Sequence, residues 1–336
     1  MRIPIGPCLA AVFLALSSPA AGWAQAIETA GSRAPGMGGA FVAVANDSSA
    51  TWWNPAGMAA GPFLDLSIYR NTIQAGGDVA PAWRTGLTGF GVITPPIGAS
   101  FYRFRLTDAT PHGSTATGQG DRQGIGTGVA IRSIPASQLG VTLAHSVFSG
   151  IHVGTTLKYV RGSVMATTGQ GPADELLDAG DDLEGADSRG TFDLDIGAIA
   201  VVGAFRAGAV VRNVREAGFG GSAGFTLPRQ ARIGGAFDGD IGLSVPLTIA
   251  LDADVQRYAG PGGDRRVIAV GAEHWLVRRR LAVRGGARFN TVGAQERSAS
   301  AGGSVALRSG MYLDAHAVFG GAADERGWGL AARVSF

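Results

Sequence analysis

The sequence predicts an all-β protein: a transmembrane antiparallel β-barrel of about 14 strands, with an N-terminal plug (a hatch) inside its lumen. Three observations predict this fold. The chain begins with an export signal, it then alternates apolar and polar residues over long runs, and it ends on an aromatic residue. Together these features are typical of barrels that cross a membrane with strands.

Residues 1–26 read as a secretory signal peptide. Arg2 supplies the positive start, an apolar stretch follows through Val12 and Leu14, and Ala24 and Ala26 form an A-x-A cleavage site. The alternative is an N-terminal membrane anchor, but the apolar stretch is too short to span a bilayer comfortably. The remaining residues, 27–336, contain no cysteine, so an exported chain would fold without disulfides.

The composition excludes several classes of protein. The chain has 336 residues with 28 Lys and Arg against 26 Asp and Glu, and this near-neutral balance disfavours nucleic-acid binding. An apolar content of 46% disfavours disorder. After the signal peptide no stretch reaches 18 consecutive apolar residues, which excludes a transmembrane helix.

An alternation of period two runs through the chain and predicts strands. In 249–258, for example, Ile249 and Leu251 alternate with Asp252 and Asp254. Fourteen or fifteen such runs are expected, near 62–71, 85–94, 97–106, 124–133, 138–148, 150–162, 190–203, 204–215, 228–239, 246–258, 265–276, 279–291, 299–308, 310–320 and 327–336.

Two architectures can hold such strands. In a soluble sandwich or barrel the apolar residues face a core, whereas in a membrane barrel they face lipid and the charges face the lumen. The runs have about 9–12 residues, close to the 9–11 or so that a tilted membrane strand needs. Connections as short as 149–150 and 277–279 alternate with long ones at 107–123, 163–189 and 214–227, which favours the membrane barrel.

The last run supports the same choice. Apolar residues stand at every second position from Trp328 through Leu330 and Val334 to the terminal Phe336. An aromatic residue that ends an alternating strand resembles the signal by which bacterial outer-membrane barrels are inserted. We therefore expect the barrel-assembly machinery to act on these residues during biogenesis.

Residues 31–57 do not read as a membrane strand. They are rich in glycine, and Pro35 and Pro55 would interrupt a ladder of hydrogen bonds. A short apolar helix over about 38–45 is expected, and Asn46-Asp47 and Asn54-Pro55 are turn formers.

This segment resembles the start of the FadL-type outer-membrane transport family and of the related PorV/PorQ-like barrels. The resemblance rests on the run Gly36-Met37-Gly38-Gly39-Ala40, then Asp47, then Asn54-Pro55-Ala56-Gly57 directly before the first strand. It implies a hatch at 27–60 inside a barrel at 61–336. The implied hatch and gating residues are Gly36, Gly38, Gly39, Asp47, Asn54, Pro55, Ala56 and Gly57.

Charges are expected on the inner wall of the barrel. They can pair with one another or with backbone groups, although the plainest interpretation is that they wet the lumen. The expected wall charges are Asp193, Asp252, Asp254, Glu273, Arg284, Arg288 and Arg333.

Three further features point to enzymes or metals only weakly. The seven acids of 174–187 fit no EF-hand spacing and read as a solvated loop, in which Leu176 and Leu177 suggest a short amphipathic helix that could dock apolar solutes. The Gly220–Gly224 stretch matches a nucleophile elbow without its strand-to-helix context. The five histidines show no metal spacing, so we expect no enzyme, cofactor or metal.

The resemblance implies a passive, hatch-gated channel for hydrophobic small molecules in the outer membrane of a Gram-negative-type envelope. Its expected partners are an apolar ligand and outer-membrane lipid, with no nucleic acid. Two alternatives stay open: a PorV-like barrel that binds a secretion-system partner without solute flux, and an aqueous porin.

Overall fold

The computed structural model describes residues 30–111, 128–219, 225–240, 246–260, 263–277, 280–294, 296–321 and 324–336. The expected signal peptide, with Ala24 and Ala26, and the Gly220–Gly224 stretch lie outside the described residues. Among the described residues, no helix is long and apolar enough to span a membrane.

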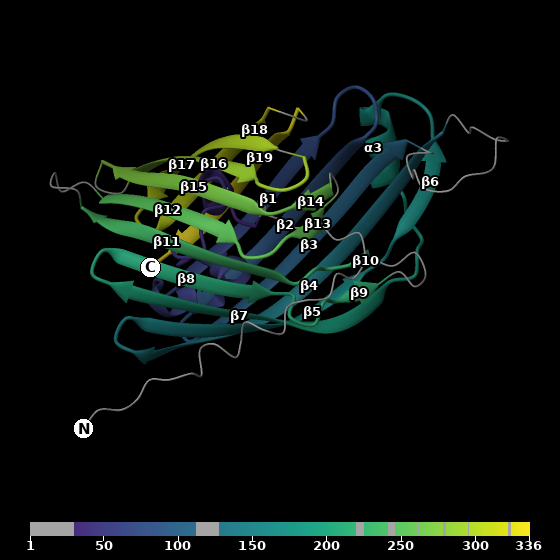
Figure 1. Ribbon diagram of the computed structural model, residues 1–336. Helices are drawn as coiled ribbons and strands as arrows, with labels where there is room; N and C mark the ends of the chain where they lie inside the picture. Colours follow the sequence, from purple (N-terminus) through teal and green to yellow (C-terminus); the bar gives the residue numbers. More distant parts are fainter. Residues whose placement is uncertain are drawn as a thin grey trace.

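The strands form one closed antiparallel barrel, as the alternation predicts (Figure 1). Fourteen strands make its wall, and the last strand pairs with the first to close it. In chain order they are β1 (Asp65–Ala75), β2 (Ala82–Thr94), β3 (Ile97–Pro111), β4 (Val129–Phe148), β5 (Ile151–Gly162), β7 (Arg189–Val202), β8 (Phe205–Arg212), β11 (Gln230–Asp240), β12 (Pro246–Asp254), β15 (Val267–Leu276), β16 (Leu281–Asn290), β17 (Arg297–Arg308), β18 (Met311–Gly320) and β19 (Arg326–Ser335).

One predicted boundary is wrong. The runs expected at 124–133 and 138–148 belong to a single strand, β4, of 20 residues. Pro135 lies inside it, at the place where the partner of β4 changes from β5 to the short strand β6 (Met165–Gly169). Because proline has no N–H to give, a gap between two partners is where a strand tolerates it.

The two faces of the wall differ in the way the alternation predicts. On β12, Ile249 and Leu251 point outward and are 46% and 55% exposed, whereas Asp252 points inward and is 1% exposed. Apolar side chains project in the same manner around the barrel, and they form the outward belt of a transmembrane barrel.

The connections are short at one end of the barrel and long at the other. We name these the short-turn end, with turns at 149–150 and 203–204, and the long-loop end. The long-loop end carries β6, the helix α3 (Ala173–Asp181), and two small hairpins, β9–β10 (Gly218–Phe219 and Phe225–Thr226) and β13–β14 (Tyr258–Gly260 and Gly263–Arg265).

Helix α3 lies against the outer face of β2, β3 and β4 at the long-loop end. Its Leu176 and Leu177 are buried with Ala82, Ala109 and Ile131. Arg84 on β2 forms ion pairs with the carboxylates of Asp178 and Asp181 of the helix, at N–O distances of 2.6 and 3.0 Å. The amphipathic helix is therefore present, but the expectation that its leucines form an exposed docking surface is wrong, because the barrel wall already covers them.

Residues 30–60, which we call the inner segment, lie inside the barrel near the short-turn end. Figure 1 shows them in purple behind the strands, on the side where the C-terminus lies. They contain α1 (Arg33–Gly36), α2 (Ala50–Trp53) and a 3₁₀ helix, η1 (Pro55–Ala60). The helix expected over 38–45 is absent because Gly38 and Gly39 adopt φ angles of +68° and +85°, which end α1 and turn the chain.

Candidate functional site

The inner segment packs its apolar side chains within the lumen. Met37, Phe41, Trp53 and Met58 are all less than 3% exposed. The rings of Phe41 and Trp53 meet edge to face, with centroids 6.2 Å apart, and the indole N–H of Trp53 donates to the backbone carbonyl of Ala30 at 2.9 Å. The segment thus forms a small core of its own, packed on the inner face of the wall near the short-turn end.

Glycines in the wall allow the backbone of the inner segment to lie directly on the strands. A Cβ on Gly286 would lie 2.2 Å from the carbonyl carbon of Met37, and one on Gly208 would lie 2.7 Å from the carbonyl oxygen of Val42. The backbone of the segment comes similarly close at Gly154 and Gly271, and at Gly197 the side chain of Asn54 does so. Since real Cβ atoms never come so close, any side chain at these positions would push the segment away.

The Asn54–Gly57 turn is fixed through the side chain of Asn54, which is fully buried. Its Oδ1 accepts from the N–H of Ala56 at 3.2 Å and so caps η1. Its Nδ2 donates to the carbonyl of Val42 at 2.9 Å and to that of Ala198 in β7 at 3.2 Å. One amide side chain therefore ties two parts of the inner segment to the wall.

The residues that follow Asn54 in this turn pack closely against the wall and against the rest of the inner segment. Pro55 lies on β5, where a Cβ on Gly154 would be 2.4 Å from its carbonyl carbon, and a Cβ on Gly57 would be 1.5 Å from the carbonyl oxygen of Ala45. At the other end of the segment, Gly36 lies against Gly302 of β17.

Two wall side chains hold backbone N–H groups of the segment. Asp252 Oδ2 accepts from the N–H of Phe41 at 2.7 Å and from the N–H of Val42 at 2.8 Å. Ser300 Oγ accepts from the N–H of Gly38 at 2.8 Å. Among the described residues, the N–H groups of Phe41 and Val42 have no backbone partner, so Asp252 satisfies donors that would otherwise be buried without one. The Gly38 N–H also donates to the carbonyl of Pro35, at 3.1 Å.

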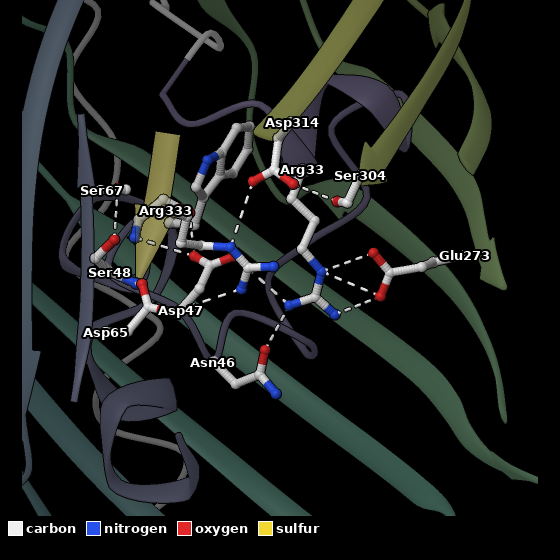
Figure 2. A network of polar contacts seen from close by, with 12 residues as sticks. Arg33, Asn46, Asp47, Ser48, Asp65, Ser67, Glu273, Ser304, Asp314 and Arg333 are labelled. Atoms are coloured by element: carbon white, nitrogen blue, oxygen red, sulfur yellow. Dashed lines mark hydrogen bonds and ion pairs between the residues drawn. The ribbon is translucent and has the colours of Figure 1, made fainter. Parts of the chain in front are cut away.

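A buried ion network joins the segment to β15 and β16 (Figure 2). Arg33 of α1 makes three hydrogen bonds to the carboxylate of Glu273, at 2.7, 2.9 and 3.1 Å. Arg284 reaches the same carboxylate with its Nε at 2.5 Å, and the indole N–H of Trp275 donates to it at 3.1 Å. Burial acts to lower the pKa of Arg33, but the charge of Glu273, the hydrogen bonds to it and the charge of Asp47 together outweigh burial and raise that pKa above its ordinary value.

The network continues to β18, β19 and β1. Arg333 lies between Asp314 and Asp65, with N–O distances of 3.3 and 3.5 Å. Asp65 Oδ1 accepts from the N–H of Ser48 at 2.8 Å. Asp47 accepts from the Ser49 N–H and hydroxyl at 3.0 and 2.5 Å and lies 3.5 Å from an Arg33 nitrogen, so the charges link both sides of the segment to the wall (Figure 2).

The expected wall charges all lie on the inner face of the strands, but they are not solvated. Asp193, Asp252, Asp254, Glu273, Arg284 and Arg288 are 1–9% exposed, and the side chain of Arg333 is 11% exposed. Asp254 pairs with Arg232 at 2.7 Å, and Arg288 contacts Glu325 and Ser298. The expectation that they mainly wet the lumen is wrong, because the inner segment and the inward-folded loops exclude water from them.

Several members of the site were not expected from the sequence. Arg33 could have been recognised as a site residue, since it is the one charged residue between residues 31 and 46 of an otherwise apolar and glycine-rich segment. Asp65 and Asp314 stand on the polar side of the alternation, as does Lys158, whose Nζ lies 2.6 Å from Asp195 Oδ1. Which charge pairs with which is decided by the barrel register, which local spacing does not reveal.

A small cavity, with room for about one water molecule, lies beside the inner segment on the side of the long loops. Its lining combines apolar side chains with hydrogen-bond donors: Trp52, Phe104, Gln138, Arg212, Asn213, Leu227 and Gln230. The guanidinium carbon of Arg212 lies 4.3 Å from the centre of the Trp52 ring. The indole N–H of Trp52 and the amide nitrogen of Gln138 are buried without a hydrogen-bond partner among the described residues, so the cavity offers two free donors.

The expected insertion residues lie on the last strand. Trp328 and Leu330 of β19 point outward and are 48% and 57% exposed, Val334 is half-buried, and Phe336 is 65% exposed. Phe336 exchanges two backbone hydrogen bonds with Leu64, at 2.8 and 3.1 Å, next to the β1–β19 closure.

Solved structures share this fold. The CymD monoaromatic hydrocarbon channel aligns with a TM-score of 0.63 at 12% identity, covering 93% of this chain and 99% of that one. A Pseudomonas aeruginosa FadL homologue has a TM-score of 0.61 at 12% identity, covering 94% of this chain and 100% of that one. The Ralstonia pickettii toluene transporter TbuX has a TM-score of 0.58 at 14% identity, covering 92% and 99%. The resemblance to FadL-type barrels is thus confirmed at the level of the fold.

Sequence comparison adds a family. No curated protein matches the chain. A family model described as "F plasmid transfer operon, TraF, protein" matches residues 67–254, which run from β1 to the end of β12. Since this match spans more than half of the chain, the protein belongs to the TraF family of F plasmid transfer operon proteins.

Proposed function

We propose that this protein is a passive outer-membrane channel for hydrophobic small molecules in a Gram-negative-type envelope, and that the inner segment is its gate. The observation that carries the proposal is the position of the inner segment, because residues 30–60 lie inside the barrel near the short-turn end with a buried core and a buried ion network. In this proposal, the channel is closed when the inner segment packs on the wall in this way.

The proposed path begins at the long-loop end. A solute would reach the cavity beside Trp52, where Phe104 and Leu227 supply apolar surface. To continue, it requires the inner segment to shift, since the backbone of the segment packs directly on wall glycines such as Gly208 and Gly286. The titles of the structural neighbours, a monoaromatic hydrocarbon channel and a toluene transporter, support an apolar solute of modest size.

The gate would move against contacts that can be exchanged. When Arg33 leaves Glu273 it keeps Asn46 and Asp47 as partners within the segment, and Arg284 remains 2.5 Å from the Glu273 carboxylate. A wall charge that stays paired lowers the cost of release, because an unpaired buried carboxylate would cost several kcal/mol. Passive gating of this kind needs no nucleotide, cofactor or metal.

The experiment is solute flux in proteoliposomes. Intact protein should admit toluene and exclude glucose, and a variant that lacks residues 30–60 should admit glucose as well. If the intact protein moves no toluene and the deletion merely opens a water-filled pore, the channel proposal fails.

That outcome would favour the alternative, a barrel that binds a partner protein of a secretion or assembly system without solute flux. The family name refers to a plasmid transfer operon, and pull-down with the intact barrel would then be the next measurement.

A further inference from the structure

A row of arginines lies on the outer wall, directly beyond the apolar belt. Strand register places Arg70 of β1 opposite Thr88 of β2, and Thr88 opposite Arg103 of β3. Arg103 is in turn opposite Ser137 of β4, and Ser137 is opposite Arg161 of β5. The row therefore crosses five neighbouring strands, with an arginine on every second one.

The row next to it, towards the short-turn end, is apolar. It consists of Ile68, Phe90, Phe101, Leu139 and Tyr159, which are opposite one another in the same order of strands. These five side chains are 39–56% exposed. The boundary between apolar and cationic outer surface thus falls between two adjacent outward rows, on the side of the long loops.

A fourth arginine, Arg105, stands two residues beyond Arg103 on the same face of β3. Strands lie about 4.8 Å apart and residues rise about 3.3 Å each, so Arg105 and Arg161 are both within roughly 7–10 Å of Arg103 along the wall. Long arginine side chains can converge across such distances on one anion. Thr88 and Ser137 between them are small and leave that space open.

Carboxylates do not neutralise this surface. Among the described residues, Arg70, Arg103 and Arg105 have no ion pair, and the outward positions of β1 to β5 hold no Asp or Glu. The acids of α3 lie farther towards the long loops, and two of them, Asp178 and Asp181, are already paired with Arg84.

We propose that Arg70, Arg103, Arg105 and Arg161 form a binding site for the phosphate groups of anionic lipids at the long-loop boundary of the membrane. Guanidinium forks match phosphate geometry and bind it bidentately. The acyl chains of the same lipid would lie on the apolar row that adjoins the arginines. This joint arrangement selects a lipid over a soluble anion, because a free phosphate would gain nothing from the apolar row.

The site would also favour one orientation of the barrel. With phosphates bound at the long-loop boundary, the apolar belt occupies the hydrocarbon layer and α3 stands outside it. This inference depends on a membrane setting and not on solute flux, so it can stand even if the channel proposal fails.

The experiment is lipid retention by the intact protein, measured by native mass spectrometry after exchange into detergent with defined lipid. The probes are phosphatidylglycerol and phosphatidylcholine of identical chains. The double variant Arg103→Gln/Arg105→Gln is compared with Arg280→Gln/Arg308→Gln, which removes the same charge from exposed positions at the short-turn end. Thermal stability of each variant shows that it is folded.

We expect the native protein to retain more phosphatidylglycerol than phosphatidylcholine. The ratio of the two retained lipids should fall at least about fivefold in the Arg103→Gln/Arg105→Gln variant and stay unchanged in the control. A variant with Arg103→Lys in place of Arg103→Gln should keep part of the preference for phosphatidylglycerol. The proposal would be overturned by equal retention of the two lipids, or by an equal loss of preference in both double variants. It would also be overturned if millimolar inorganic phosphate displaced the lipid, because that result would reveal a site for the free anion.

Discussion

Arg33 of the inner segment and Glu273 of β15 are joined by three hydrogen bonds, although 240 positions separate them in the chain. Glu273 also holds Arg284 at 2.5 Å, so one buried carboxylate balances a cation from the segment and a cation from the wall. This arrangement makes Glu273 the residue through which attachment of the segment and stability of the wall are coupled.

Replacing Glu273 by Gln should therefore destabilise the protein strongly. The change leaves two buried guanidiniums without their shared carboxylate, which costs roughly 3–5 kcal/mol. We expect a clear fall in Tm, measured by the heat-induced shift in electrophoretic mobility of the barrel. Glu184→Gln, at an exposed position beyond α3, is the matched control and should leave Tm unchanged.

A side chain at Gly286 should displace the inner segment without harming the wall. A Cβ there would lie 2.2 Å from the Met37 carbonyl carbon, whereas one on the adjacent Gly285 would meet only the Ser300 carbonyl oxygen at 3.9 Å. Gly286→Val should raise ion conductance in planar bilayers, and Gly285→Val should not. Equal conductance of the two folded variants would show that the segment does not block the pore.

The carboxylate of Asp252 should protect two amides of the segment. It accepts from the N–H groups of Phe41 and Val42, and hydrogen bonds to charged groups contribute roughly 1.5–3 kcal/mol. Asp252→Ala should accelerate hydrogen exchange of these amides by roughly tenfold to a hundredfold, measured by mass spectrometry of peptides from 38–45. Exchange unchanged in those peptides would mean that other contacts hold the turn.

The free donors of the cavity should select among solutes. Gln138 Nε2 and Trp52 Nε1 have no partner among the described residues, so a solute with a carbonyl or hydroxyl oxygen can satisfy them. Gln138→Leu should slow the flux of benzyl alcohol relative to that of toluene, because toluene has no acceptor to lose. A proportional fall in both fluxes would instead indicate a general change in the shape of the cavity.

The barrel itself could be predicted from the sequence because its determinants are local. Alternation at Ile249–Asp254 tells which side faces lipid, and it does so without knowledge of any neighbour. One strand boundary was wrong: two runs were expected at 124–133 and 138–148, yet β4 continues through Pro135 between them because its partner changes there.

The site could be predicted only in part, because its contacts depend on register. Asp252 and Glu273 were recognisable as inward charges. The sequence did not reveal that Asp252 binds backbone N–H groups and that Glu273 binds Arg33. Gly208 and Gly286 lie on the inward side of their strands, where a lumen filled with water would not require glycine. Glycines at these inward positions could have indicated that the backbone of another segment lies against the wall.

The central claim is that the inner segment must move for a solute to pass, and a reversible tether tests it most directly. The hydroxyls of Ser48 in the segment and Ser67 in β1 are 2.6 Å apart, and residues 27–336 contain no cysteine. Toluene flux through liposomes containing the Ser48→Cys/Ser67→Cys variant can therefore be measured with the disulfide formed and after reduction, with each single variant as a control. We predict that oxidation stops the flux and that reduction restores it. Equal flux in the fully oxidised and fully reduced protein would contradict the account.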